Sequence, residues 1–384
     1  AALLRAGARE GAEPGRLRFP RPMVEEALAA TPKTARLCGK TRARDIQIPR
    51  ADGSFVLRTG TGAHGYVDPR DASYRNMDLT AVGEIAAVAD RLDQMGFIAH
   101  PFVHGVPEVT ADIHSYARIT AHTTKHVWMQ PYQKENVDYL LRIAAVAAGE
   151  IVGMVTMAHV LSPGLPVIAT PLMFALDMRT GSALQSSVEA MQAASLSIQL
   201  VKQGFGLMAH TYGAGSDTPD TDGQSMAERA FLMQTVALAG ADILGGVGQL
   251  ECATVFSPVQ AVLDDEMSAM MRRFTRPPEI SDAALNFGEM LGVPVGGHFL
   301  DSDHTVSACR DQLIPRVFQR MGRDDYEASG RRTALDAARE AALSAIEAAP
   351  PSHLSEDQAR EIAALTRAAD RHIVEVYQGA VETI

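Results

Sequence analysis

Apolar and polar positions follow the spacing of alternating helices and short buried strands along most of the chain. From Asp78, a helical pattern over residues 79–95 precedes an apolar run at 97–103, and a second helix and strand follow at 109–122 and 127–132. Apolar residues that recur every three or four positions indicate a helix, and a short continuous apolar run indicates a buried strand. Helices that alternate with buried strands predict a parallel sheet.

The same alternation continues through the second half of the chain. A helix is predicted to begin at Ser257, with Pro258 in its first turn and Gln260 at the capping-box position. In chain order, the other elements predicted here are a helix at 135–149, a strand at 166–171, a helical stripe from Leu184 to Val201, a strand at 205–212, a helix at 226–239 and a strand at 241–247.

The two ends of the chain depart from this alternation. Residues 1–77 contain recurrent Pro and Gly, and the alternating stretch Ser54–Arg58 predicts a short hairpin within an irregular N-terminal extension. Residues 326–384 are rich in Ala, Arg and Glu and predict a helical C-terminal tail. In that tail Ser355 and Gln358 have the spacing of a capping box. Residues 78–325 form the main predicted domain.

Composition and charge restrict the kind of partner. The 384 residues are 46% hydrophobic and 21% charged, as in an ordinary globular protein. The formal net charge of −11 argues against a nucleic acid or an anionic membrane as partner, because both attract positive surfaces. The three cysteines lack C-x-x-C spacing, and apolar runs fall short of the roughly 20 residues that span a bilayer, so we expect a cytoplasmic protein.

Several loop motifs occur in a specific order. They are Phe174–Gly181 with Asp177 and Arg179, Gly213–Asp217 with Asp220 and Gly223-Gln224, Gly248–Glu251 leading to Val262–Glu266, Gly296–Leu300, and Asp303–Thr305. Together they resemble loops of the trimethylamine methyltransferase family, and the resemblance covers residues 97–320 in the family's order. One such loop would be weak support, whereas five in order are specific.

The resemblance implies a (β/α)₈ TIM barrel with an irregular N-terminal extension and a helical C-terminal tail. It also implies transfer of a methyl group from a methylated amine to the cobalt of a separate corrinoid protein, as in the one-carbon metabolism of methanogens. Namesake members carry pyrrolysine near the region that corresponds to Gly213–Gly223, whereas this chain has only standard residues. A quaternary amine such as glycine betaine, which members without pyrrolysine use, is therefore the expected substrate.

At Glu150-Ile151 a helical segment runs into another apolar segment without a strand or turn signal. A βαβ series cannot skip a strand, and the five clear strands fall short of the eight in a closed barrel. Either the barrel is incomplete or residues are absent at this junction, and our hypothesis is that a disordered stretch is left out of the numbering here. An intact mass equal to the 41.1 kDa of the sequence would argue against a segment left out of the numbering.

No tightly bound cofactor and no metal ligand set is expected in this chain. Asp112-x-His114 is similar to a corrinoid-binding motif, but Ala117 stands where that motif has glycine. The spacings His100-x-x-x-His104 and His122-x-x-x-His126 resemble helical metal ligands, but neither pair has a suitable context. We expect the corrinoid to be carried by a partner protein, and the chain to form a homo-oligomer.

Candidate site residues follow from the chemistry of a quaternary ammonium, whose departing amine needs no general acid. Catalysis then depends on the orientation of the substrate and the exclusion of water. Binding of the cation depends on aromatic faces and carboxylates. The candidates for substrate binding are Trp128, Tyr212, Phe256, Asp217 and Asp220, and those for catalysis are Glu251 and His298. Each candidate has a competing structural interpretation. These are core packing for the rings, capping or turns for Asp217 and Asp220, and a structural role for the His298 loop.

Two further functions stay open at this stage. A barrel lyase or aldolase acting on a small carboxylate would need an activated lysine or a metal cluster near the strand ends. Lys125, Lys134 and Lys202 are instead predicted on helices or at loop starts. A betaine-binding relative without activity is the second alternative.

Overall fold

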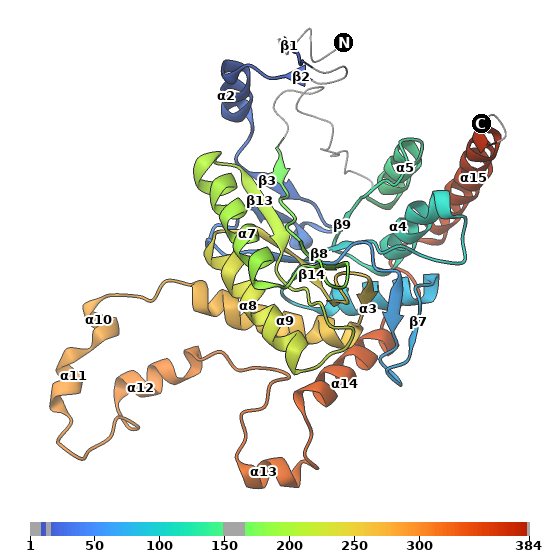
Figure 1. The fold of residues 1–384 in the computed structure, drawn as a ribbon. Coiled ribbons are helices and arrows are strands. Elements are labelled where there is room, and N and C mark those ends of the chain that lie inside the picture. Colours follow the sequence, from blue (N-terminus) through green and yellow to red (C-terminus); the bar gives the residue numbers. More distant parts are fainter. Residues whose placement is uncertain (1–8, 13–16, 149–165, 382–384) are drawn as a thin grey trace.

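The computed structural model describes residues 9–12, 17–148 and 166–381, and its centre is a curled sheet of six parallel strands (Figure 1). From one edge to the other the strands are β10 (Ile168–Ala169), β13 (Met208–Tyr212), β14 (Ile243–Val247), β5 (Val56–Thr59), β8 (Met95–Ala99) and β9 (His126–Trp128). All neighbouring pairs are parallel. The α/β class and the parallel sheet predicted from the sequence are therefore confirmed.

Strand β5 corrects the interpretation of Ser54–Arg58 as a hairpin. It pairs in parallel with β8 on one side and β14 on the other, so the sheet begins before residue 78. The alternating pattern suggested a hairpin, but both faces of this strand are covered, and Val56, Leu57 and Arg58 are all buried. Period-two alternation alone indicates a strand but cannot specify its partner.

The order of the strands resembles that of a barrel with an opening. β14, the last strand of the sheet in chain order, lies beside β5, the first, whereas β9 and β10 form the two outer edges. The chain between these edges contains α5 (Asn136–Ala148) and the Glu150-Ile151 junction, which lies outside the described residues. Among the described residues the central sheet thus has six strands, so the expected eight-stranded barrel is shown only in part.

Helices cover the outer face of the sheet. They are α3 (Leu79–Arg91), α4 (Ala111–His122), α7 (Val188–Gln199), α8 (Gly223–Leu238) and α9 (Pro258–Thr275). Leu57, Ile98 and Leu244 point toward them in the main hydrophobic core. On the concave face, Val56 and Ile243 pack with residues of the β3–β4 hairpin (Ala35–Leu37 and Ile46–Ile48), which covers this face.

Several smaller elements surround the sheet. The strands β6 (Gly65–Val67), β7 (Tyr74–Asn76), β15 (Gln249–Leu250) and β16 (Val255–Phe256) form a second sheet, and β11 (Ala175–Asp177) pairs with β12 (Ser182–Leu184). At the N-terminal end, β1 (Arg9–Glu10) pairs with β2 (Leu17–Arg18), ahead of α2 (Arg21–Ala30). No helix in the described ranges is both long and apolar enough to cross a bilayer.

The C-terminal helices return to the body of the molecule. α14 (Ala334–Glu347) packs on α3 and α9, and α15 (Glu356–Val381) packs on α4 and α5. Ser355 and Gln358 form the predicted reciprocal cap, with bonds of 2.9 and 3.2 Å, and Ser257 caps α9 as predicted. Before α14, the short helices α10 (Asp282–Leu285), α11 (Phe287–Gly292), α12 (Asp303–Ala308) and α13 (Arg323–Ala328) lie outside the main body (Figure 1).

Candidate active site

A polar layer lies above the apolar floor of the concave face. Arg58 and His210 follow Val56 and Met208 by two positions on β5 and β13, so they share the concave face one step nearer the carboxyl ends of the strands. In parallel α/β barrels, ligands bind at this end, where loops from several strands converge. The layer is therefore the candidate substrate site.

Arg58 is the centre of this layer. Its Nε donates to Nε2 of His210 at 2.8 Å, and its Nη1 donates to the Thr59 carbonyl at 2.8 Å. Arg58 is 3% exposed, and no Asp or Glu of the described residues forms an ion pair with it. Burial lowers the pKa of Arg58, but a guanidinium stays protonated in proteins. The layer thus contains a buried positive charge without a counter-charge.

His210 is held neutral beside this cation. Burial, with the adjacent Arg58 charge, holds the pKa of His210 well below its ordinary value. Since Nε2 accepts from Arg58, the proton of the neutral ring lies on Nδ1, which is 3.4 Å from the Thr170 hydroxyl. Gly245 on β14 leaves the necessary space, because a Cβ there would lie 2.8 Å from His210 Nε2.

Two of the predicted aromatic residues meet in this layer. The Arg58 guanidinium carbon lies 5.7 Å from the ring centre of Trp128 and 5.8 Å from that of Tyr212. Their inward faces therefore contact a cation that belongs to the protein itself. Phe256 is not part of this group, since it is buried on β16 in the main core.

A second aromatic group lies in the loops that follow β5, β8 and β9. The ring of Phe102 is 4.9 Å from His64, 5.2 Å from His104 and 5.9 Å from Tyr132. These rings are exposed or half-buried, so this group faces the mouth of the sheet. None of these rings is among the candidates predicted from the sequence, although aromatic and histidine residues directly after the predicted strands are an available signal.

The loops after β13 and β14 contain three of the predicted acidic residues. Asp217 accepts hydrogen bonds from the backbone of Gln185 and Ser186 at 2.9 and 3.0 Å, and burial raises its pKa. Asp220 accepts from the Thr221 backbone nitrogen in the same loop at 2.7 Å. Asp217 therefore joins the loop after β13 to the segment between β12 and α7, in addition to any contact with substrate.

Glu251 lies in a strained turn at the same mouth. Glu251, Cys252 and Ala253 all have positive φ angles of 49°, 49° and 74°, which cost energy in residues other than glycine. Two backbone bonds to the β13 loop hold the turn, from Glu251 to Thr218 and from Cys252 to Ser216. The exposed Glu251 carboxylate accepts from the Thr254 hydroxyl at 3.2 Å.

The Val262–Glu266 motif supports these loops from below. Asp264 on α9 forms a fully buried ion pair with Arg229 on α8 at 2.8 Å and accepts from the Gly248 backbone nitrogen. Arg229 also donates to the carbonyls of Ala214 and Gln249, one in each loop. Arg229 is not among the candidates predicted from the sequence, because no local pattern shows what it contacts.

His298 is not brought together with the other candidates. It lies between α11 and α12 with its side chain 65% exposed, 3.4 Å from Asp301. In Figure 1 these helices extend away from the sheet. The structure therefore separates His298 from the concave face.

The residues of the Asp112-x-His114 motif are occupied by contacts within the chain. Asp112 is buried and accepts from the Asn136 side chain and the Tyr132 backbone. His114 Nε2 lies 2.9 Å from the Asp370 carboxylate of α15. These two side chains join α4 to its neighbours and do not offer a free corrinoid ligand.

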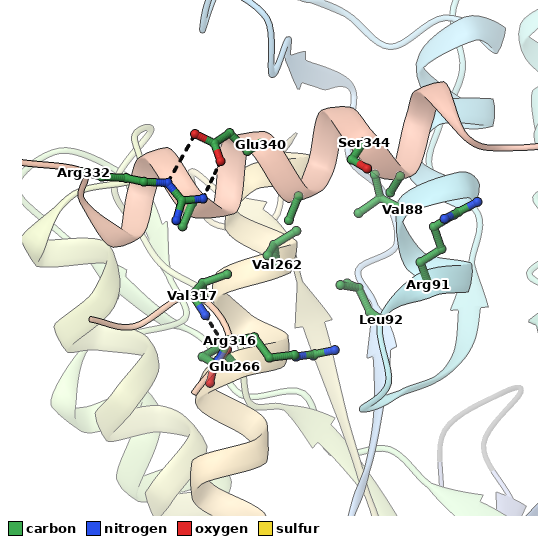
Figure 2. Close-up of a pocket in the computed structure, with 13 residues that line it drawn as sticks. Val88, Arg91, Leu92, Val262, Glu266, Arg316, Val317, Arg332, Glu340 and Ser344 are labelled. Atoms are coloured by element: carbon green, nitrogen blue, oxygen red, sulfur yellow. Dashed lines mark hydrogen bonds and ion pairs between the residues drawn. The ribbon is translucent and has the colours of Figure 1, made fainter. Parts of the chain in front are cut away.

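A cavity of about 460 Å³ lies on the helical side of the molecule, between α3, α9 and α14 (Figure 2). Its charged residues have partners, since Arg332 pairs with Glu340, and Glu266 accepts from the Val317 backbone. It is lined by these helices and by residues that precede α13 and α14, not by the loops at the carboxyl ends of the strands. We do not assign the substrate to it.

Comparison with known proteins identifies the family to which this sequence is similar. The sequence profile described as trimethylamine methyltransferase matches residues 1–153 and 142–372, in two segments that meet near the end of α5. A trimethylamine methyltransferase of Desulfitobacterium hafniense is 23% identical over 407 residues, covering 88% of this chain and 82% of the relative. That alignment is longer than this chain of 384 residues, so the relative contains residues that the chain lacks within the match.

Two further relatives match shorter regions. A trimethylamine methyltransferase of Methanosarcina mazei is 25% identical over 233 residues, which cover 61% of this chain and 47% of the relative. A glycine betaine methyltransferase of Desulfitobacterium hafniense is 27% identical over 179 residues, covering 46% of this chain and 37% of the relative. The chain thus matches less than half the length of these two proteins.

Proposed function

The chain belongs to the trimethylamine methyltransferase family and is a methyltransferase, and from this premise we propose that it moves a methyl group from glycine betaine, or a similar quaternary amine with a carboxylate, to the Co(I) of a separate corrinoid protein. The observation that carries the choice of substrate is the buried guanidinium of Arg58, which has no acidic partner among the described residues.

The charge of Arg58 favours a zwitterion over a simple amine. Two positive charges about 6 Å apart repel each other by roughly 3 kcal/mol at an effective dielectric constant of 20. A methylated ammonium without a carboxylate would add its charge to that of Arg58. A betaine carboxylate would instead neutralise the guanidinium, while Trp128 and Tyr212 flank the same place.

The residues of this chain would act by binding and orientation. A quaternary ammonium leaves as a neutral tertiary amine, so no side chain has to supply a proton. Arg58 would hold the carboxylate, and the half-buried rings of Phe102 and Tyr132, with the Glu251 carboxylate, would surround the ammonium at the mouth. The corrinoid cobalt supplies the nucleophile that accepts the methyl group, and its carrier protein would approach this same mouth.

We also propose that the complete fold is a (β/α)₈ barrel, in which two further βα units would lie between α5 and β10. The pairing of β14 with β5 supports the proposal, because the last and first strands of such a barrel are neighbours. The length of the alignment with the Desulfitobacterium relative supports it too, since the extra residues lie within the match.

The family removes the lyase or aldolase alternative, and the geometry agrees. Lys125, a candidate for an activated lysine, lies just before β9 and donates to the carbonyls of Ala89 and Leu92. This is the amino end of the strand, opposite the loops that bind substrate in such folds. The other alternative is a betaine-binding protein without activity, which an experiment has to distinguish from a methyltransferase.

The decisive experiment is methylation of a Co(I) corrinoid protein, or of free cob(I)alamin, followed by absorbance with glycine betaine, other betaines and trimethylamine in turn. We expect turnover with a betaine and little with trimethylamine. Turnover with trimethylamine alone would contradict the substrate proposal. Tight calorimetric binding of a betaine without turnover would contradict the reaction and leave a binding protein.

A further inference from the structure

Asp112, in the first turn of α4, is a buried carboxylate that the proposed function does not use. It is 0% exposed, and no Lys, Arg or His of the described residues forms an ion pair with it. Its oxygens accept from the backbone nitrogens of Ile113 and Tyr132 at 2.9 and 2.8 Å, and from the Asn136 side chain at 2.7 Å. Burial raises the pKa of Asp112, but hydrogen bonds from three N–H groups favour the ionised carboxylate. A negative charge without a counter-charge is therefore buried here.

This carboxylate lies behind the aromatic group at the mouth. It holds the backbone of Tyr132, whose ring stacks on Phe102 at 5.9 Å with 19° between the ring planes. Asn136 belongs to the same network, because its side chain also donates to the Val109 carbonyl at 2.8 Å. Burial, and after it the Asp112 charge, raises the pKa of Tyr132, so the charge acts at this ring. The loops after β8 and β9 are thus joined around Asp112.

Asp112 and Arg58 are two buried charges of opposite sign at different depths of the candidate site. Arg58 lies within β5, whereas Asp112 lies at the start of the helix that follows β8, the strand beside β5. A betaine with its carboxylate on Arg58 and its ammonium at the mouth has each charge nearest the opposite charge of the protein. Opposite charges attract over several ångströms where protein and substrate replace water.

We propose that Asp112 makes the mouth select a quaternary ammonium over a neutral group of the same shape, through its charge behind the Tyr132 ring. This role rests on the proposed function, in which the ring of Tyr132 contacts the ammonium. Asp112 does not touch the substrate and is therefore a positioning residue. Two opposite charges roughly 10 Å apart, with the ring between them, attract each other enough at an effective dielectric constant of 20 to change binding about tenfold.

The charge of Asp112 should act on binding rather than on the rate of methyl transfer. The nitrogen loses its positive charge as the neutral tertiary amine departs, so a nearby carboxylate stabilises the bound substrate more than the transition state. Removal of the charge should therefore raise KM without lowering kcat. A mere loss of loop geometry would lower kcat, because transfer depends on the orientation of the substrate.

The test compares glycine betaine with tert-butylacetate, in which carbon replaces the nitrogen and the positive charge is absent. Calorimetric titration of the full chain gives both dissociation constants. We expect Asp112→Asn to weaken glycine betaine about tenfold and to leave tert-butylacetate within about twofold. Asp112→Ser, with a smaller neutral side chain, should change the ratio of the two constants equally. Asp112→Glu keeps the charge and should leave the ratio at its wild-type value.

Asp90→Asn is the matched control for the loss of a carboxylate. Asp90 lies in the last turn of α3 and also accepts N–H and O–H bonds, from Thr123 and Thr124, which precede β9. It is thus at the amino ends of the strands, away from the mouth. Its substitution should change neither dissociation constant.

Equal weakening of both ligands in Asp112→Asn and Asp112→Ser would show that Asp112 only shapes the loops. A ratio that stays at the wild-type value in both variants, or a fall in kcat without a rise in KM, would also overturn the proposal. Failure of the proposed function gives a different result. The wild type would then bind neither ligand, or Arg58→Met would leave both dissociation constants unchanged.

Discussion

At the scale of single residues, Arg58 is unusual because its neighbours are rings, a neutral histidine and a carbonyl rather than a carboxylate. Removing a charge from water without compensation is unfavourable, so such a residue lowers the stability of the folded chain. Residues of this kind persist where the charge serves a ligand. The substitution of Arg58 therefore separates a binding role from a structural one.

We predict that Arg58→Met leaves the thermal midpoint of unfolding unchanged or raises it, and raises KM for glycine betaine by roughly tenfold to a hundredfold. Hydrogen bonds to charged groups contribute roughly 1.5–3 kcal/mol, which sets that range. Calorimetry and steady-state kinetics measure the two effects. Arg229→Met is the matched control: this equally buried arginine is paired with Asp264, so its loss should lower the midpoint strongly.

A loss of several degrees in Arg58→Met, with KM unchanged, would show that Arg58 is structural.

His100 gives the folded state a dependence on pH. It is 1% exposed and accepts from the Gln130 backbone nitrogen, and burial lowers its pKa to about 4 from 6.5. Its contribution is fully present above pH 6.5 and is lost as the pH falls toward 4, because the unfolded chain takes up the proton first. At pH 5 the loss amounts to roughly 2 kcal/mol.

We therefore predict that the free energy of unfolding falls between pH 6.5 and pH 4, and that His100→Gln makes this fall shallower. Gln keeps an acceptor for Gln130 but has no proton to gain. Urea titrations at several pH values give the profile. A variant with the same pH profile as the wild type would show that His100 does not cause the slope.

At the scale of elements, the Arg229–Asp264 pair joins α8 to α9 and holds the β13 and β14 loops through backbone contacts. Breaking a buried ion pair by removing one member leaves an uncompensated charge. We predict that Asp264→Ala lowers the free energy of unfolding by about 3–5 kcal/mol. Glu327→Ala, which removes the exposed carboxylate that Arg323 and Arg331 share, should cost less than about 1 kcal/mol.

Chemical denaturation of both variants measures the difference, and equal losses would contradict a special role for the buried pair.

The sequence predicted elements where their signals are local. The start of α9 at Ser257-Pro258 was predictable because a cap, a first-turn proline and a capping-box residue occur together. Strands were less predictable, since β10 has two residues and β9 has three. The alternation of Ser54–Arg58 indicated a strand correctly, but its parallel partners are decided by contacts with β8 and β14 far along the chain.

At the scale of the whole molecule, the candidate site depends on how the strands are ordered. Arg58 and His210 are 152 positions apart and meet only because β13 and β5 flank β14. Trp128 and Tyr212 were predictable from their residue types and predicted places, and the structure brings both rings close to Arg58. It could not select Arg58, because no spacing in the sequence places a buried cation between those two rings.

The position of Trp128 also makes the layer visible to spectroscopy. It is the single tryptophan of the chain, so all indole fluorescence originates 5.7 Å from the Arg58 guanidinium. We predict that glycine betaine changes the intensity or wavelength of this emission in a saturable way, without corrinoid, and that Arg58→Met abolishes the change. Full turnover without any change in emission would place the substrate elsewhere. A saturable change would measure ligand binding separately from methyl transfer.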